Sequence, residues 1–223
     1  MIFNHEKWKA ELQEAIDAYT SLHDPVICAG AMKEYYANSR LTEAIAVGTS
    51  IMEQEETGRV MTAKEVANVR EKYTKEFSEH AHKGALTYRR QMIVIASTIF
   101  EAMMNEFLRF HFTKFPEKMY NYVSDDGRIK FKDLIDFSSK EEVLSYYSKI
   151  SAKSFTAKPW KVVLNRLEEL LKIDISSKEK VLEMLLLRNE IIHEGVKMEV
   201  DNDDVFDFIE AVEDVLEILS VNQ

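Results

Sequence analysis

Apolar residues recur every three or four positions along most of this chain, with polar and charged residues between them. That spacing is typical of amphipathic α-helices, whereas a half-buried strand alternates every second residue. The chain contains only 6 glycines and 3 prolines, so few positions interrupt the pattern. We therefore predict an all-α helical bundle, with helices at residues 6–19, 26–54, 63–82, 86–112, 139–150, 159–172, 178–194 and 203–219.

Three of the predicted helix starts have the spacing of a capping box, in which a hydroxyl accepts an early backbone N–H and a glutamate three residues later reaches back. The pairs are Thr62 with Glu65, Ser139 with Glu142, and Ser176 with Glu179. Residues 123–131 form the one plausible hairpin turn, although the same sequence suits a plain loop between helices.

The apolar content divides the chain near Gly84. Residues 1–83 form polar helices with moderate apolar faces, and residues 84–223 carry the strongly apolar helices. We predict a helical bundle at 84–223, with residues 1–83 as an N-terminal helical extension packed on it.

Charge and cysteine content narrow the functional classes. A formal net charge of -10 argues against coating nucleic acid by bulk attraction, which needs a positive field, but permits a local basic cleft. The single cysteine, Cys28, excludes an intramolecular disulfide and favours a reducing compartment, so we predict a cytoplasmic location. We predict no signal peptide, since charges begin at Glu6, and no membrane contact, since the longest apolar run, 92–100, is too short to span a bilayer.

An arginine interrupts the apolar face of the helix predicted at 178–194, in the stretch LLLRNEIIHEG. At 100° per residue, the residues within about 60° of Arg188 are Val181, Met184, Leu185, Ile191 and Ile192. The acidic residues gather on the opposite side of the helix, at Glu179, Glu183, Glu190 and Glu194. We therefore expect Arg188 to point inward.

A guanidinium keeps its charge, so burying it alone costs several kcal/mol. Two partners for Arg188 are open. One is Glu101, the only charged residue between Arg90 and Glu106 on the most apolar predicted helix. The other is an anionic ligand that enters a cleft or a subunit interface.

Asn189 and His193 are four residues apart and share one flank of the apolar arc. Arg188 and His193 are separated by roughly 140° on an ideal helix, so they converge only if the helix end deforms or a second subunit brings another copy close. Gly195 suits a left-handed C-cap, which places His193 in the final turn, where the helix dipole favours positive charge.

These residues resemble the HEPN superfamily of all-helical domains. Its ribonuclease members carry an arginine followed, after four to six residues, by a histidine. RNEIIH, from Arg188 to His193, has the four-residue spacing, with Asn189 directly after the arginine. The upstream stretch YRRQMIVIASTIFEAMMNEF is similar to the first helix of bacterial members with an embedded glutamate, here Glu101. The resemblance covers about residues 85–223.

The resemblance implies a metal-independent endoribonuclease that needs no cofactor and works as a homodimer, with both motif copies lining one cleft. It assigns proton transfer to His193 and binding of the scissile phosphate to Arg188. Asn189 would orient the phosphate or the imidazole, and Glu101 would position Arg188 or His193.

For the biological role we predict defence, toxin–antitoxin or stress response, with a cognate antitoxin as a candidate partner. The charge of -10 points to a narrow set of RNA substrates or to a blocked cleft. Basic residues that can rim such a cleft are Lys83, Arg89, Arg90, Lys153, Lys158 and Lys161. Two alternatives are open: a non-catalytic HEPN-like module that binds RNA, nucleotide or a protein partner, and a helical scaffold in which Arg188 and Glu101 are a structural pair.

Overall fold

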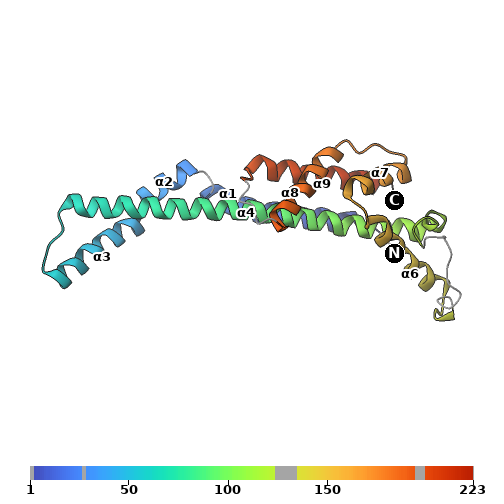
Figure 1. Ribbon diagram of the computed structural model, residues 1–223, viewed down its shortest axis with the longest axis horizontal. Helices are drawn as coiled ribbons and strands as arrows, with labels where there is room; N and C mark the ends of the chain where they lie inside the picture. Colours follow the sequence, from blue (N-terminus) through green and yellow to red (C-terminus); the bar gives the residue numbers. More distant parts are fainter. Residues whose placement is uncertain (1–2, 27–28, 124–134, 194–198, 223) are drawn as a thin grey trace. The chain divides into compact units, whose positions relative to one another are not determined.

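The computed structural model describes residues 3–26, 29–123, 135–193 and 199–222. Within these residues it contains helices and no strand, which confirms the all-α prediction. The helices are α1 (His5–Val26), α2 (Ala29–Ala37), α3 (Arg40–Thr57), α4 (Ala63–Lys114), the 3-10 helix η1 (Pro116–Met119), α6 (Lys140–Thr156), α7 (Trp160–Leu171), α8 (Lys178–His193) and α9 (Asn202–Val221) (Figure 1).

Two predicted divisions between helices are wrong, and two predicted helices end too early, since α1 continues to Val26 instead of residue 19 and α6 to Thr156 instead of residue 150. The single helix predicted at 26–54 is divided into α2 and α3, because Ser39 adopts an extended conformation and its side chain accepts the N–H of Leu41, which starts a new helix. The helices predicted at 63–82 and 86–112 are one helix, α4, which continues through Gly84. Glycine weakens a helix by about 1 kcal/mol, and the neighbouring Ala85, buried beside Met32, offsets that cost by packing.

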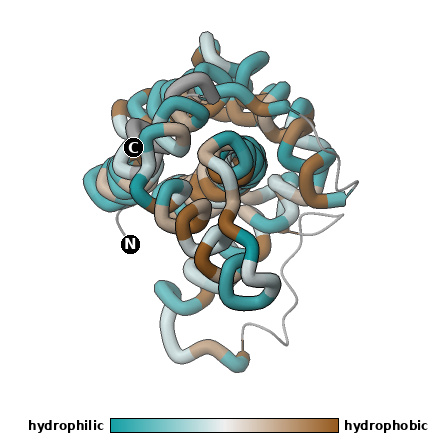
Figure 2. Tube along the Cα trace, turned by 90° about the vertical axis from the view of Figure 1, so that its left-hand side faces the viewer, coloured by the Kyte–Doolittle hydropathy of each residue, from teal (hydrophilic) through white to brown (hydrophobic). Residues whose placement is uncertain are grey.

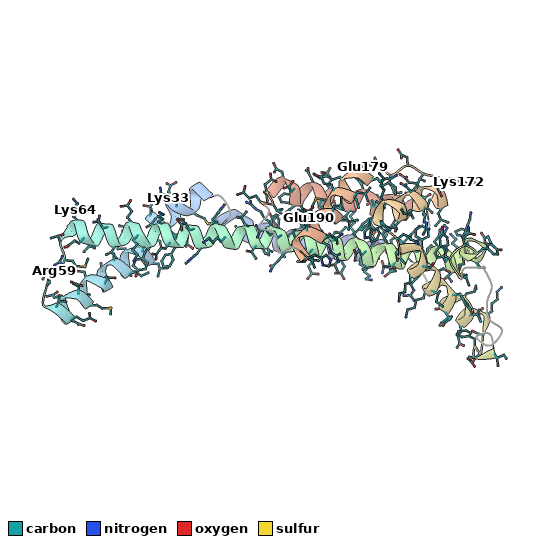
Figure 3. The ribbon with its side chains drawn as sticks, in the orientation of Figure 1. Lys33, Arg59, Lys64, Lys172, Glu179 and Glu190 are labelled. Carbon is teal, nitrogen blue, oxygen red and sulfur yellow. The ribbon has the colours of Figure 1, made fainter. Side chains whose placement is uncertain are left out.

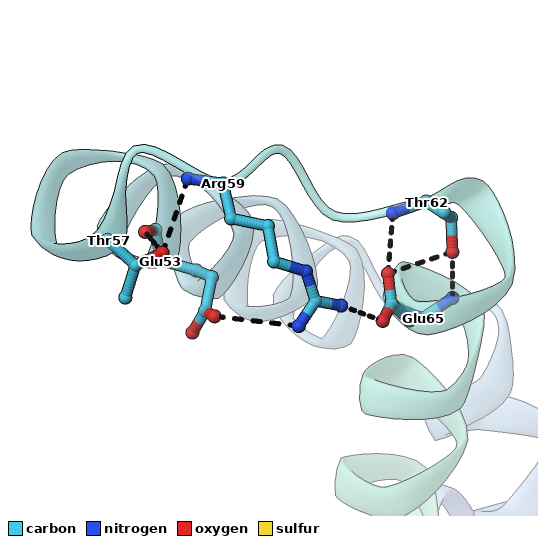
Figure 4. A network of polar contacts seen from close by, with 5 residues as sticks. All are labelled: Glu53, Thr57, Arg59, Thr62 and Glu65. Carbon is cyan, nitrogen blue, oxygen red and sulfur yellow. Dashed lines mark hydrogen bonds and ion pairs between the residues drawn. The ribbon is translucent and has the colours of Figure 1, made fainter.

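The predicted capping boxes have three different outcomes. At the start of α4 the box is complete: the Glu65 N–H donates to the Thr62 hydroxyl at 3.3 Å, and the Thr62 N–H donates to the Glu65 carboxylate at 2.8 Å. Arg59 also bonds Glu65 and lies 4.0 Å from Glu53 (Figure 4). Hydrogen bonds from Thr62 and then from Arg59 lower the pKa of Glu65.

The other two boxes differ from the prediction. The Ser139 hydroxyl accepts the N–H of Glu142, but the Glu142 carboxylate accepts from the N–H of Ser138. At α8 the predicted Ser176 cap is replaced by a tight turn, in which the Lys178 N–H donates to the Ile175 carbonyl at 3.1 Å. The predicted turn at 123–131 lies, from residue 124 onward, outside the described residues.

The chain forms two compact units, residues 17–91 and residues 1–16 with 92–223. Helices α1 and α4 contribute to both, because each of them crosses a boundary. The sequence division at Gly84 into an extension and a bundle stays a prediction, since compactness does not test independent folding.

In the unit of residues 17–91, aromatic side chains join α4 to the helices before it. Tyr19 stacks on Tyr88 at 5.6 Å, and the Tyr88 hydroxyl donates to the Ala18 carbonyl. Tyr36 contacts Phe77 at 5.7 Å between ring centroids. Figure 2 shows hydrophobic and hydrophilic residues interspersed along the helices, as expected of amphipathic helices.

In the unit of residues 1–16 and 92–223, α4 supplies the central apolar face. Phe100, Met103, Phe107 and Phe112 are fully buried, and the Phe3 ring meets the Phe107 ring edge-on at 5.4 Å. Helix α8 packs against α7 and α9. The side chains that α9 buries are Val205, Phe208, Ile209, Ala211, Val212, Val215, Leu216 and Leu219. No helix in the described part of the chain combines the length and hydrophobicity needed to cross a lipid bilayer.

His111 of α4 lies in this core among phenylalanine rings. It is only 5% exposed, neither ring nitrogen has a hydrogen-bond partner, and Phe115 lies 4.9 Å away. Burial, aided by Lys118 and Lys114, lowers the pKa of His111 to about 4 against the opposing effect of Glu117. The fold therefore holds this imidazole neutral.

A pH dependence of stability follows. Because the pKa of His111 is lower in the folded state, its contribution to the free energy of unfolding is fully present above about pH 6.5 and is lost as the pH falls toward 4. We expect urea denaturation to show a loss on the order of 2 kcal/mol between pH 7 and pH 4.5. His111→Phe should reduce this loss, and an unchanged pH profile in that variant would contradict the assignment.

Candidate active site and adjoining groove

Helix α8 presents its predicted apolar face to the core over its first three turns. Val181, Met184 and Leu185 are buried, while Glu179, Glu183 and Glu190 are exposed, as the sequence predicted (Figure 3 labels Glu179 and Glu190). Glu194 lies outside the described residues.

The last turn of α8 departs from the prediction. Ile192, placed on the buried face by the helical projection, is 47% exposed. The side chain of Arg188 is 25% exposed and so lies at the edge of the core. The projection ignores that neighbouring helices cover only part of a helix, so it overestimated burial at this end.

Glu101 is the partner that Arg188 meets in the structure. Arg188 Nη2 lies 3.7 Å from Glu101 Oε2, and the Glu101 side chain is 31% exposed. Arg188 Nη1 donates to Asn189 Oδ1 at 3.0 Å. The guanidinium is therefore drawn sideways toward the flank of α8 that carries Asn189. Arg188 Nε is buried without a hydrogen-bond partner among the described residues.

The contact with Arg188 fixes the orientation of the Asn189 amide. A guanidinium only donates hydrogen bonds, so the amide oxygen must face it. The Nδ2 group of Asn189 then points away from Arg188 as a donor, and within the described part of the chain it has no hydrogen-bond partner. This leaves one directed donor beside the cation.

His193 ends α8 and is exposed. It makes no hydrogen bond or ion pair with any described residue, so the structure joins Glu101, Arg188 and Asn189 by contact but leaves His193 apart. Gly195, the predicted cap, lies outside the described residues. The convergence of Arg188 and His193, through a deformed helix end or a second subunit, stays a prediction.

A groove of about 720 Å³ opens between the start of α7 and the flank of α8 that carries Asn189. Its lining includes Trp160, Lys161, Leu182, Leu185, Leu186 and Asn189. The Trp160 ring is supported by Phe100, 5.2 Å away, and Phe100 directly precedes Glu101 on α4. One turn of α4 therefore supports both the groove and the ion pair.

Sequence reasoning named Lys161 as a rim residue but missed the groove itself. The available signal was a second stripe on α8, formed by Leu182, Leu186, Asn189 and His193 at helical spacing. Leu186 is 63% exposed. No three His, Cys, Asp or Glu side chains in the described ranges lie close enough together to hold a metal ion.

The chain matches the RiboL-PSP-HEPN family over residues 66–220, and it belongs to this family of HEPN domains. The match begins near the start of α4 and ends in α9, so it includes the helices that carry Glu101, Arg188 and the groove. This confirms the resemblance to the HEPN superfamily. Searches among curated proteins and solved structures gave no match.

Proposed function

We propose that this protein is a metal-independent endoribonuclease of the HEPN type that acts as a homodimer. The observation that carries the proposal is the arrangement on α8: Arg188 is bound by Glu101 and Asn189, and the exposed His193 follows on the flank that Asn189 occupies. A cation that binds phosphate and a side chain that carries protons are the groups that RNA transesterification uses, and the Asn189 amide orients the cation.

In the proposed reaction the ribose 2′-oxygen attacks the adjacent phosphorus and the bond from phosphorus to the 5′-oxygen breaks. One His193 takes the 2′-hydroxyl proton, and the His193 of a second copy gives a proton to the leaving 5′-oxygen. Arg188 donates hydrogen bonds to the non-bridging oxygens, where charge accumulates. Glu101 restrains the guanidinium, and Asn189 sets its direction. The products are a 2′,3′-cyclic phosphate and a 5′-hydroxyl.

The proposed biological setting is defence, toxin–antitoxin or stress response, in the cytoplasm, with a cognate antitoxin as a partner. The single cysteine favours a reducing compartment. The net charge of -10 favours a narrow substrate set, because the protein lacks the positive field that supports non-specific RNA binding.

The decisive experiment is incubation of purified protein with total RNA and transfer RNA in excess EDTA, followed by mapping of the product ends. We expect cleavage that survives chelation and leaves 2′,3′-cyclic phosphates. Cleavage abolished by EDTA, or leaving 3′-hydroxyl ends, would contradict the mechanism. No cleavage by folded, inhibitor-free dimer would instead favour a non-catalytic module that binds RNA, nucleotide or protein.

A further inference from the structure

The groove beside Asn189 has the size and lining of a site for a small aromatic ligand. Its volume of about 720 Å³ lies within the range of ligand sites, roughly 300–1,000 Å³. Trp160, Leu182 and Leu186 give it apolar walls, and the Asn189 amide supplies a directed donor. Such a combination of flat apolar walls and one directed donor suits a heteroaromatic ring with an acceptor on its edge.

The groove and the proposed reaction centre lie next to each other along α8, because Asn189 lines the groove and bonds Arg188. At 100° per residue, Leu182, Leu186, Asn189 and His193 fall within about 60° of one another on α8. Asn189 and His193 are separated by about 6 Å along the helix axis, close to the spacing of neighbouring nucleotides. A base beside Asn189 would therefore belong to a nucleotide next to the phosphate that Arg188 binds and at which His193 transfers protons.

Charge indicates how the ligand would lie. Lys161 is exposed at the rim, whereas the Lys180 ammonium is bonded to Asp207 at 3.1 Å. Glu179 and Glu183 line the end of the groove away from Asn189, where they would repel a phosphate. The phosphates would therefore lie toward Arg188 and the base toward Leu186.

We propose that this groove binds the nucleobase next to the scissile phosphate, with the base on Trp160 and Leu186 and an acceptor on its edge bonded to Asn189 Nδ2. That this base lies next to the scissile phosphate rests on the proposed function, but binding of a base in the groove does not require cleavage. It makes Trp160 and Leu186 determinants of which RNA sites are cut.

Tryptophan fluorescence tests the site directly. Trp8 and Trp160 are the two tryptophans of the chain, so Trp8→Phe leaves Trp160 as the only one. We expect AMP, GMP, CMP or UMP to quench it saturably, with the four nucleotides differing in affinity. Leu186→Glu should weaken that binding by at least about tenfold. The matched control is Leu41→Glu, an exposed leucine of the other unit, which should bind as the parent does.

Three results would overturn the proposal: no saturable quenching by any of the four nucleotides, equal quenching in Leu186→Glu, or conversion of a dimer to a monomer by Leu186→Glu alone in sedimentation. The last would mean that a second copy covers the groove. Saturable quenching without RNA cleavage would uphold the site and reject the nuclease function, while cleavage without quenching would do the reverse.

Discussion

His193→Ala lowers the rate of RNA cleavage by about 10²- to 10⁴-fold, while the thermal unfolding midpoint stays close to that of the wild type. The first part follows because no other histidine lies on α8, so the variant has no replacement proton carrier on this helix. The second follows because His193 is exposed and makes no hydrogen bond or ion pair with another described residue. Cleavage rate in EDTA and a thermal melt measure the two effects.

His80→Ala is the matched control for this prediction. His80 is also an exposed helical histidine, in α4, and the mechanism gives it no role. It should cleave like the wild type. Full activity in His193→Ala would contradict the proposed proton transfer by His193. A large fall in the melting midpoint of the variant would mean that His193 stabilises the fold.

Arg188→Ala should lower cleavage by about 10²- to 10³-fold, because the transition state loses the donor aimed at its developing charge. Its effect on stability should be small, about 1 kcal/mol or less. The Arg188–Glu101 pair is 25% and 31% exposed, so water can solvate the carboxylate that the variant leaves behind. Single-turnover cleavage and urea denaturation separate the two quantities.

Arg59→Ala offers a comparison for this prediction, since Arg59 also pairs with a glutamate, Glu65, but lies far along the chain from α8. It should retain full activity. If Arg188→Ala instead lowered the free energy of unfolding by about 3 to 5 kcal/mol, the pair would behave as a buried ion pair. That result would support a helical scaffold in which Arg188 and Glu101 are a structural pair. Glu101→Gln combined with Arg188→Ala should cost less activity than the sum of the two single changes, because the two side chains act together.

Helical periodicity in the sequence predicted the inward face of α8, and it left two partners open for Arg188, of which the structure shows Glu101. A guanidinium on the apolar face of a helix needs an anionic partner, and Glu101 is the one charged residue on the most apolar predicted segment. The shared flank of Asn189 and His193 followed from helical spacing alone. The turn of the guanidinium toward Asn189 was not predictable, because it depends on side-chain conformation.

Other features depended on how the helices pack. The groove exists because α7 and α8 meet with Trp160 held on Phe100, and periodicity within either helix carries no information about that meeting. Ile192 is exposed because the neighbouring helices do not cover the last turn of α8. The break at Ser39 left a local signal, a capping serine, but the apolar repeat continues through it and hid the boundary.

Phe100 and Glu101 occupy adjacent positions on a single helix, one contacting Trp160 and the other Arg188. Because the two side chains share one helix, both contacts depend on the number of residues in this part of α4. One extra residue just after Glu101 would rotate both side chains by about 100° relative to Met104 and Phe107, and would remove both contacts at once. Substitutions can alter either contact separately, so α4 should accept point changes here far more readily than single insertions or deletions.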